Sequence, residues 1–571
     1  MTTLYLNNTQ VYPDTSQRIK LTRENPYFTD SEAYTLDVTL PMAILENRSF
    51  FRNMQRKDVS KTASKYSCRL LVGNKVALAG TAHVTQVTQE AVKVQLVGGR
   101  SEVNFLGDED YIDTLPLGTM QSSAKDTDTG ISGRTSPVYD ETAGKVKTVV
   151  QWRIIDLARL IIEHYGYTVT ENAFDTEPWN SLYVATAKWT MYPAHTLPHW
   201  TAREFFTELC HFFNATLVTD QNSKTVRIVH TPQFFDSVKT IGLEIADEYT
   251  VDISDDEQGE GTLADNNLSY DLSDSEAHDY DCVADSLRLF AATTEYDSYA
   301  KALQAWEDMD EDERKKHIFK TPVGKYTTWE HDYSDRGAAA MVTFTQIDVL
   351  APLTRASDAQ ETQLKICPVA IDMCERKTFS NTTDRFYAPS LANPTGDETT
   401  GWYVHAKYSG SAPTSEESDE GSTIQEMVEE GTDTETGDKE DRLQVMFIGD
   451  IYTEYYRESF YRPGTYTEHT HLVGFTDQHY KPSHGGTSHE SWSLSLCPTR
   501  TTHYLGQLHE NGFSFNTKVK HAFKFVATDM PDPTQVFIIR GKRYGCEKIE
   551  AQIDSQGLQR LMTGYFYEMK E

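Results

Sequence analysis

Five histidines lie close together in the C-terminal third of the chain, and imidazole is a common metal ligand. They fall within 21 residues, mixed with Gly and Ser: His469, His471, His479, His484 and His489. Imidazoles at positions i and i+2 of a strand face one side and could share a metal ion, and three chains meeting on an axis could supply six. The surrounding composition is that of a polar surface loop. We therefore interpret the group as an exposed loop and predict no metal ligand.

Three alternating aspartates imitate the beginning of a calcium-binding loop. Asp308, Asp310 and Asp312 have the spacing of its first three ligands. The sixth position is Glu313 rather than Gly, and the twelfth is Phe319 rather than Glu, although the loop needs both. We expect an acidic helix surface here.

Other candidate motifs also lack the context that their chemistry needs. The GEGTLA stretch at 259–264 matches a dinucleotide fingerprint, but it lies in an acidic run without a preceding apolar strand. His489-Glu490 and His509-Glu510 lack the second histidine of a zinc protease helix. No GxSxG or Walker A sequence occurs, and nothing selects a pair among the many carboxylates. We predict no catalytic residue, no cofactor-binding residue and no cofactor, and hence no enzyme.

The charge of the chain argues against nucleic-acid recognition. Its 571 residues hold 53 Lys and Arg against 86 Asp and Glu, a formal charge of −33. Binding a duplex requires cations that displace counterions from phosphates. The excess of acids favours solubility, and a negative surface would also repel passing DNA.

The cysteines and the apolar patterning bear on where the protein is made. Seven cysteines without any CxxC favour reduced thiols over a disulfide framework. The start, MTTLYLNNTQ, lacks the basic and apolar regions of a secretory signal. No run of about 18 apolar residues occurs, so we predict no membrane-spanning segment. We expect synthesis in a cytoplasm.

Residues 1–120 are rich in predicted strands, and we predict that they form an N-terminal β-barrel-like domain. YTLDVTL at 34–40 alternates polar and apolar residues until Pro41. In GTAHVTQVTQEAVKVQLVGG at 80–99, the apolar positions reverse phase after Val84, which indicates a bulge. Bulged, alternating strands can curve into a small barrel with a dry interior and a wet face of Lys, Gln and Thr.

A helical period replaces the alternation after a polar segment, 121–150, which we expect to be a linker or loop. QWRIIDLARLIIEHYG at 151–166 predicts a helix with Gly166 at its C-cap, and Thr201 with Glu204 forms a capping box before a second helix. A hairpin, ATLVTDQNSKTVRIV, follows. We predict an α+β domain over 151–250.

The remaining sequence alternates acidic segments with strands. Residues 251–330 are predicted to be an acidic loop plus a helix, and 331–571 a β-rich C-terminal region with an acidic mobile loop at 414–441. The last part, QVFIIRGKRYGCEKIEAQI and LMTGYFYEM, reads as strand, glycine turn, strand and a further strand. The predicted fold class is mainly β, with an α+β insertion and small β-barrel domains.

Several of these segments resemble structural tail proteins from phages and prophages of gut bacteria. They are ENPYFTDSEAYTLDVTLPM (Glu24 to Met42) with Asn47 and Phe50, the 80–99 stretch, PHWTAREFFTELCHFFNATLVTDQNSKTVRIV and VFIIRGKRYGCEKIEAQI with LMTGYFYEM. The resemblance covers about a third of the chain and is structural rather than catalytic. The acidic segments and the histidine-rich loop depart from it.

The resemblance implies a baseplate hub or tail-tip protein in a virion tail. Such a protein is a homotrimeric ring of tail-hub-type β-barrels that joins the sixfold tail tube to a threefold spike. Its expected partners are further copies, the tube, the spike and the distal tail protein, with genomic DNA only in transit. We place the ring wall at residues 64–97 and expect the chain's charge to give the DNA channel a negative lining.

Two other functions stay open. A receptor-binding, adhesin-like tail protein would expose aromatic loops such as TEYYRESFYRPGTYTEH (Thr453 to His469). A tail-associated cell-wall hydrolase would need a selected pair of carboxylates.

Overall fold

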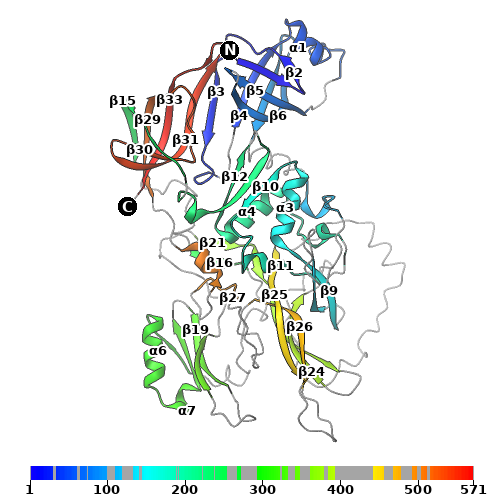
Figure 1. The fold of residues 1–571 in the computed structure, drawn as a ribbon, viewed down its shortest axis with the longest axis vertical. Helices are drawn as coiled ribbons and strands as arrows, with labels where there is room; N and C mark the ends of the chain where they lie inside the picture. The colour runs from blue at the N-terminus through cyan, green and yellow to red at the C-terminus, as the bar shows by residue number, and fades with distance from the viewer. Residues whose placement is uncertain are drawn as a thin grey trace, which may run out of the picture.

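The fold is mainly β, as predicted, and its sheets are curled (Figure 1). The structure is a computed structural model, and all structural statements concern the residues that it describes. These are 2–29, 34–60, 65–73, 75–98, 110–118, 133–140, 145–187, 190, 192–220, 223–236, 238–253, 267–271, 292–321, 324–331, 341–346, 361–377, 383–391, 442–455, 467–476, 492–497, 503–510 and 515–569.

The first sheet contains the predicted wall. Its six strands run in the order β2-β1-β5-β6-β7-β4. Every second residue points inward, and the interior is fully apolar: Leu4, Leu6, Leu36, Val38, Leu40, Leu70, Leu78, Val92, Val94 and Leu96 are each at most 1% exposed. Its elements are β1 (Thr2–Leu6), β2 (Thr9–Val11), β4 (Tyr34–Pro41), α1 (Leu45–Phe50), β5 (Lys65–Val72), β6 (Lys75–Val87) and β7 (Ala91–Gly98).

A bulge bends this sheet where the sequence predicts one. The register of β6 against β7 shifts between Val84 and Gln86, and a second shift lies between Leu70 and Leu71 of β5. An extra residue on one strand increases the local twist and bends the strand. The two shifts therefore help the 13-residue β6 to curl the sheet around its core.

Two amide side chains cover the end of this curled sheet at β4. The Gln17 amide donates to the Asp37 carbonyl at 2.8 Å and accepts from the Thr39 N–H at 2.8 Å, as a neighbouring strand would. Asn47, which is fully buried, accepts from the Tyr12 N–H and donates to the carbonyls of Tyr12 and Pro41. The chain after β2 is thereby fastened to β4 and α1.

The second sheet unites the two ends of the sequence. Its order is β14-β30-β31-β33-β29-β15, and β3 also pairs with β31. β14 and β15 are separated by two residues but pair with opposite ends of the sheet, so a single segment joins those ends. The elements are β3 (Ile19–Glu24), β14 (Thr240–Gly242), β15 (Ile245–Ile253), β29 (Phe515–Val526), β30 (Val536–Ile539), β31 (Lys542–Asp554), β32 (Gly557–Leu558) and β33 (Leu561–Met569).

A third buried amide fastens the chain directly after β3. Asn25 donates to the carbonyls of Pro533 and Cys546 at 3.0 and 2.9 Å and accepts from the Tyr27 N–H at 3.0 Å. Tyr27 and Phe28 then enter an aromatic joint with Phe234, Phe235, Phe515, Tyr567 and their apolar neighbours. This joint connects the second sheet to the α+β unit.

The α+β unit forms as the helical period predicts. Thr201 and Glu204 make the predicted capping box of α4, which ends at Asn214 in a left-handed conformation. Gly166, with φ of +78°, follows α3. Both helices cover a three-stranded sheet, β10-β13-β12. The bounds are α3 (Ile154–His164), β10 (Thr168–Asn172), α4 (Ala202–Phe213), β12 (Ala215–Asp220), β13 (Thr225–His230), η1 (Ile112–Thr114), η2 (Trp179–Ser181), η3 (Pro193–Thr196) and η4 (Thr231–Gln233).

An eight-stranded sheet lies against this unit, and part of it differs from the prediction. Residues 134–140 and 145–150, expected in a linker, form a hairpin, because RTSPVYD and KVKTVVQWR alternate although they are polar. The path is β22-β25-β11-β9-β8-β24-β23, with β26 beside β25. The strands are β8 (Arg134–Asp140), β9 (Lys145–Arg153), β11 (Leu182–Val184), β22 (Ile366–Pro368), β23 (Ala370–Lys377), β24 (Thr383–Leu391), β25 (Leu443–Tyr455) and β26 (Thr467–Phe475).

A smaller four-stranded sheet carries the predicted helix of the 251–330 segment. It pairs in the order β17-β18-β19-β20, and α6 packs on it through Ala302 and Trp306. Its elements are β17 (Ala292–Glu295), α6 (Tyr299–Asp308), α7 (Glu311–Arg314), β18 (His317–Thr321), β19 (Gly324–His331) and β20 (Met341–Gln346). Short pairs complete the described fold: β16 (Asn267–Tyr270) with β21 (Glu361–Leu364), and β27 (Trp492–Ser493) with β28 (His503–Tyr504), before η9 (Leu505–His509).

The arrangement has two levels. Figure 1 places the first and second sheets side by side at one end of the molecule, with both chain termini beside the second sheet, and the α+β unit beneath them. We call the first and second sheets together the barrel layer. The predicted boundaries stay predictions, but β3 belongs by its pairing to the C-terminal sheet rather than to a separate domain of residues 1–120.

Replacing Asn47 tests how strongly the first sheet depends on its amide. In Asn47→Leu, the N–H of Tyr12 and the carbonyls of Tyr12 and Pro41 lose their partner. We expect a loss of about 3 kcal/mol, since each buried polar group left unpaired costs about 1–3 kcal/mol. Gln17→Ala, at a half-exposed position, should cost about 1 kcal/mol. Hydrogen–deuterium exchange of peptides from β2 and β4 measures both; unchanged protection of β4 in Asn47→Leu would contradict the assignment.

Candidate functional site

The outer face of the predicted wall is polar, as expected. Lys65 of β5, His83 of β6, Gln95 of β7 and Asp37 of β4 form one row across the sheet by register. Lys65 and Asp37 are exposed, as is Arg69, four residues further along β5. The row and its neighbours offer hydrogen-bonding and charged groups to a partner or to solvent.

The charge of the segments that build this wall does not support the expected negative lining, which stays a prediction. Residues 1–100 hold 13 Lys and Arg against 8 Asp and Glu, and 515–571 hold 9 against 7. Residues 101–514 hold 31 against 71, so the whole acid excess lies between the two segments that build most of the barrel layer. The total charge of a chain does not reveal how the charge is distributed over its parts.

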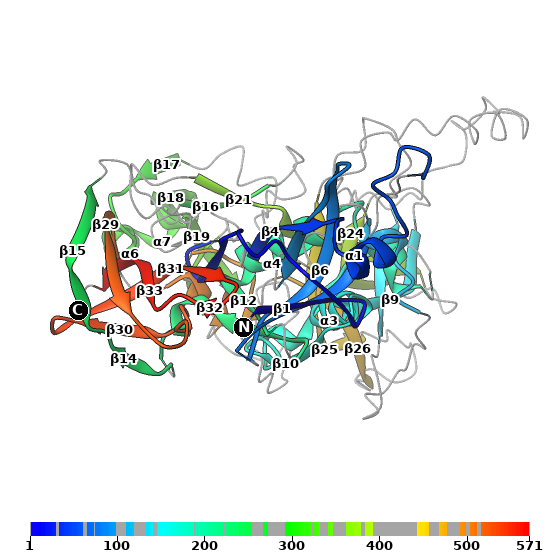
Figure 2. The ribbon, with the colours of Figure 1, turned by 90° about the horizontal axis from the view of Figure 1, so that it is seen from above.

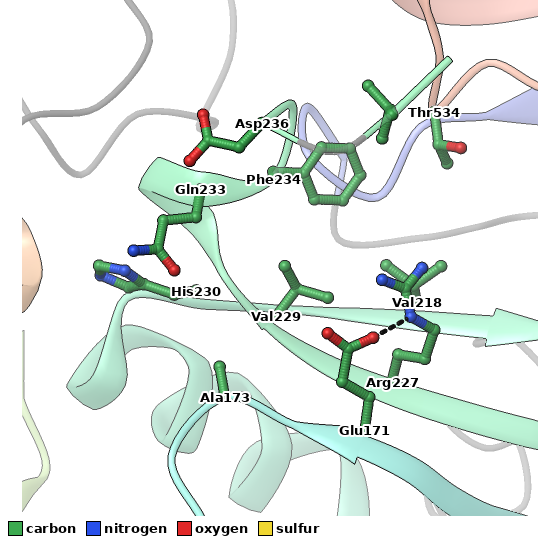
Figure 3. A pocket seen from close by; sticks show the side chains of 11 residues that line it. Glu171, Ala173, Val218, Arg227, Val229, His230, Gln233, Phe234, Asp236 and Thr534 are labelled. Atoms are coloured by element: carbon green, nitrogen blue, oxygen red, sulfur yellow. Dashed lines mark hydrogen bonds and ion pairs between the residues drawn. The ribbon is translucent and has the colours of Figure 1, made fainter. Parts of the chain in front are cut away.

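A pocket of about 360 Å³ lies where the α+β unit meets the second sheet (Figure 3). One wall is the face of the three-stranded sheet turned away from the helices, and the other is η4 with the chain that follows it. The lining is mixed, with apolar and charged side chains: Glu171, Ala173, Val218, Arg227, Val229, His230, Gln233, Phe234, Asp236, Val238 and Thr534.

Most of the ionisable and hydroxyl groups of this pocket are engaged by neighbours. The Arg227 Nε donates to the Glu171 carboxylate at 2.6 Å, and both side chains are about half exposed. The Thr534 hydroxyl donates to Asp532 at 2.8 Å. The His230 Nε2 lies 2.7 Å from the Leu508 carbonyl and therefore carries the proton that it donates. Burial lowers the pKa of His230, with a smaller opposing effect of the Leu508 carbonyl.

Among the described lining residues, these contacts leave no hydroxyl paired with a base. A nucleophile needs a base within hydrogen-bond reach, and the one hydroxyl among the described lining residues, that of Thr534, donates to an exposed turn carboxylate instead. The apolar floor from Val218, Val229 and Phe234 continues into the aromatic joint. We regard the pocket as a cavity beside a joint between structural units.

The sequence candidates for metal binding do not come together in the described part of the chain. Asp308 ends α6, Asp310 is the N-cap of α7 and Asp312 lies in its first turn, as the interpretation of an acidic helix surface expects. Within those described residues, no group of three or more His, Cys, Asp or Glu is placed to hold a metal ion.

The histidine-rich segment is described only at its beginning. His469 and His471 lie on β26 and pair in register with Thr453 and Ile451 of β25. The other three histidines, the 259–264 motif and the aromatic stretch at 456–466 lie outside the described residues. Those predictions stay predictions.

Two histidine contacts could not be read from sequence. His509, followed by a glutamate, is fully buried, and its Nε2 lies 3.1 Å from the Phe212 carbonyl at the end of α4. His199 lies 3.1 Å from Asp113 through its Nδ1, and Tyr111 stacks on its ring with 3.7 Å between centroids. Each pair joins residues far apart in the sequence, so no local motif signals it.

The cysteines agree with the expectation of reduced thiols. Cys68, Cys210, Cys367, Cys497 and Cys546 are buried thiols. Burial raises the pKa of Cys546 well above its ordinary value, which keeps this thiol protonated and unreactive. Within the described part of the chain, no helix is both long and apolar enough to cross a membrane.

Three half-buried histidines should make stability fall with acidity. Burial lowers the pKa of His230, His317 and His521. The unfolded chain therefore binds protons at these sites at a higher pH than the folded chain does. We expect the free energy of unfolding to decrease as the pH falls through and below 6.5, the ordinary histidine value.

The variant His230→Gln isolates one part of this effect, because its amide can still donate to the Leu508 carbonyl but does not titrate. Urea unfolding across this pH range should show a smaller slope for His230→Gln than for the wild type. An identical slope would contradict the assigned burial of His230.

Comparisons with known proteins give a weak structural similarity. No protein-family model matches the chain, and no curated protein matches it. The 43 kDa tail protein of prophage MuSo2 from Shewanella oneidensis is similar with a TM-score of 0.32 and 8% identity, over 99% of this chain and 97% of that chain. The tail protein from Neisseria meningitidis MC58 is similar with a TM-score of 0.32 and 6% identity, over 99% and 95%. We transfer no residue role from either protein.

Proposed function

We propose that this chain is a structural protein of a phage tail, a baseplate hub or tail-tip protein whose copies form a homotrimeric ring. The observation that carries the proposal is the barrel layer: two curled sheets lie side by side at one end of the molecule (Figure 1). The segments that resemble tail proteins supply strands to both sheets. β4 and β7 come from the N-terminal segments, and β30, β31 and β33 from the closing one.

The build of these sheets fits a structural wall. Their interiors are closely filled, and side-chain amides replace missing backbone partners at Gln17, Asn25 and Asn47. Unpaired edges invite uncontrolled pairing with other chains. Side-chain amides that occupy the edge groups prevent such pairing and fix the strands in place. In this function the ring joins tail tube to spike, contacts the distal tail protein and lets genomic DNA pass.

Assembly of the full-length protein tests the proposal. We expect native mass spectrometry to find a closed trimer and negative-stain electron microscopy to show rings, with the location in purified virions at the tail tip. A chain that stays monomeric at every concentration would contradict it. Clearing of cell-wall substrate in a zymogram, lost on carboxylate substitution, would favour the hydrolase instead.

A further inference from the structure

Two segments at opposite ends of the barrel layer differ in the sign of their charge. Seen from above, β15 forms one end of the layer, and α1 lies on the other sheet, away from it (Figure 2). We call residues 45–57, α1 and the turns after it, the basic knob. We call residues 244–253, which include β15, the acidic edge.

The basic knob combines positive charge with an exposed apolar side chain. It holds Arg48, Arg52, Arg56 and Lys57 against a single acid, Glu46. Arg56 forms an ion pair with Asp58, directly after the knob, at 2.6 Å, so Arg52 and Lys57 are the cations on which the proposal rests. Leu45 is 70% exposed although it is a large apolar residue.

Buried residues fix the shape of the knob. Phe51 and Met54 are 2% and 7% exposed and anchor the turns in the first core. The Arg48 side chain donates to the Met42 carbonyl at 3.0 Å. The knob is thus preorganised for binding, which reduces the entropy lost when a partner is bound.

The acidic edge has the complementary properties. Glu244, Asp247, Glu248 and Asp252 lie within it, and it contains no Lys or Arg. Ile253 is 77% exposed, the highest exposure among the large apolar residues described, and Tyr249 is 55% exposed.

The acidic edge also offers backbone groups. Residues 249–253 of β15 pair with 519–523 of β29. Among the strands that the structure describes, none pairs with the opposite side of residues 249–253. A strand with exposed apolar side chains and one open side is a surface that proteins either cover or use for association.

We propose that the acidic edge of one copy binds the basic knob of the next copy. The occupant is a second copy because each patch finds its complement on the same chain, at separate places in one layer. Such head-to-tail contacts join different surfaces and give a ring when the rotation between copies closes. Leu45 of one copy and Ile253 of the other supply the apolar centre, and the charges set the register and speed the encounter.

This inference rests on the proposed ring and names the surfaces that hold it together. Two exposed charges are reversed on each side: Arg52→Glu with Lys57→Glu in the knob, and Glu244→Lys with Asp252→Lys at the edge. We expect each double variant to raise the dissociation constant of the ring by about tenfold or more, since like charges then face one another. The fourfold variant, with both sides reversed, should recover the wild-type assembly.

A matched control uses two exposed lysines outside the barrel layer, Lys301 of α6 and Lys316, which follows α7. Lys301→Glu with Lys316→Glu makes the same change in net charge as the reversed knob, and it should leave assembly unchanged. Circular dichroism and thermal unfolding verify that every variant folds. Added salt should weaken the wild-type ring, because exposed charges are screened over about 10 Å at 0.1 M salt.

Mixing the two double variants adds a test of the head-to-tail geometry. In an equimolar mixture, favourable contacts form only between unlike variants, so the copies must alternate around a ring. An odd-numbered ring cannot alternate, and closed trimers should therefore not recover on mixing.

The outcomes separate the two proposals. Rings that tolerate both reversals, that fail equally in the lysine control, or that are not restored in the fourfold variant would overturn this contact while leaving the ring intact as a proposal. A wild-type chain that never associates would overturn both.

Discussion

The constraint behind this architecture is that the edges of a curled sheet must be satisfied. Backbone N–H and C=O groups along an edge each need a partner, and an amide side chain can supply both a donor and an acceptor from one residue. Gln17, Asn25, Asn47 and Gln151 all do this: each donates to a carbonyl of a separate segment and accepts from a backbone N–H. Gln151, for example, bonds both the carbonyl and the N–H of Thr186 at 3.0 and 2.9 Å. Leucine at such a position would fill the same space and leave the backbone unpaired.

These fastenings tie distant parts of the chain together. β3, within the first 24 residues, pairs along its whole length with β31, and Asn25 reaches the carbonyl of Cys546. The first core even includes Ile553 from the C-terminal sheet. Contacts of such sequence separation form late and slowly, because long loops must close before any contact is gained. The barrel layer is therefore a product of the complete chain, whereas the α+β unit draws its helices and hairpin from one continuous stretch.

The sequence predicts local elements well and partners poorly. Alternation placed β4, β12, β13 and β33, the capping box placed the start of α4, and a phase reversal located the bulge at Val84. These features depend on neighbours within a few residues. The pairing of residues 134–140 with 145–151 contradicts the loop expected there, because a polar composition favours a loop even where the residues alternate. The sheet to which β3 belongs, the amide contacts and the pocket at His230 depend on residues hundreds of positions away. The total charge can be counted from the sequence. That residues 1–100 and 515–571 are basic and residues 101–514 acidic becomes meaningful only once the structure shows which segments build the barrel layer.

Because β15 pairs with β29, the acidic edge can form only after the C-terminal part of the chain has been synthesised. β15 ends at Ile253, but the strand that holds it begins at Phe515, so a ribosome that stops between them releases a chain whose acidic edge has no support. Such a fragment could not present the surface through which we propose copies join. Truncated products would then be excluded from the growing particle without a separate inspection step, and each incorporated subunit would be full length.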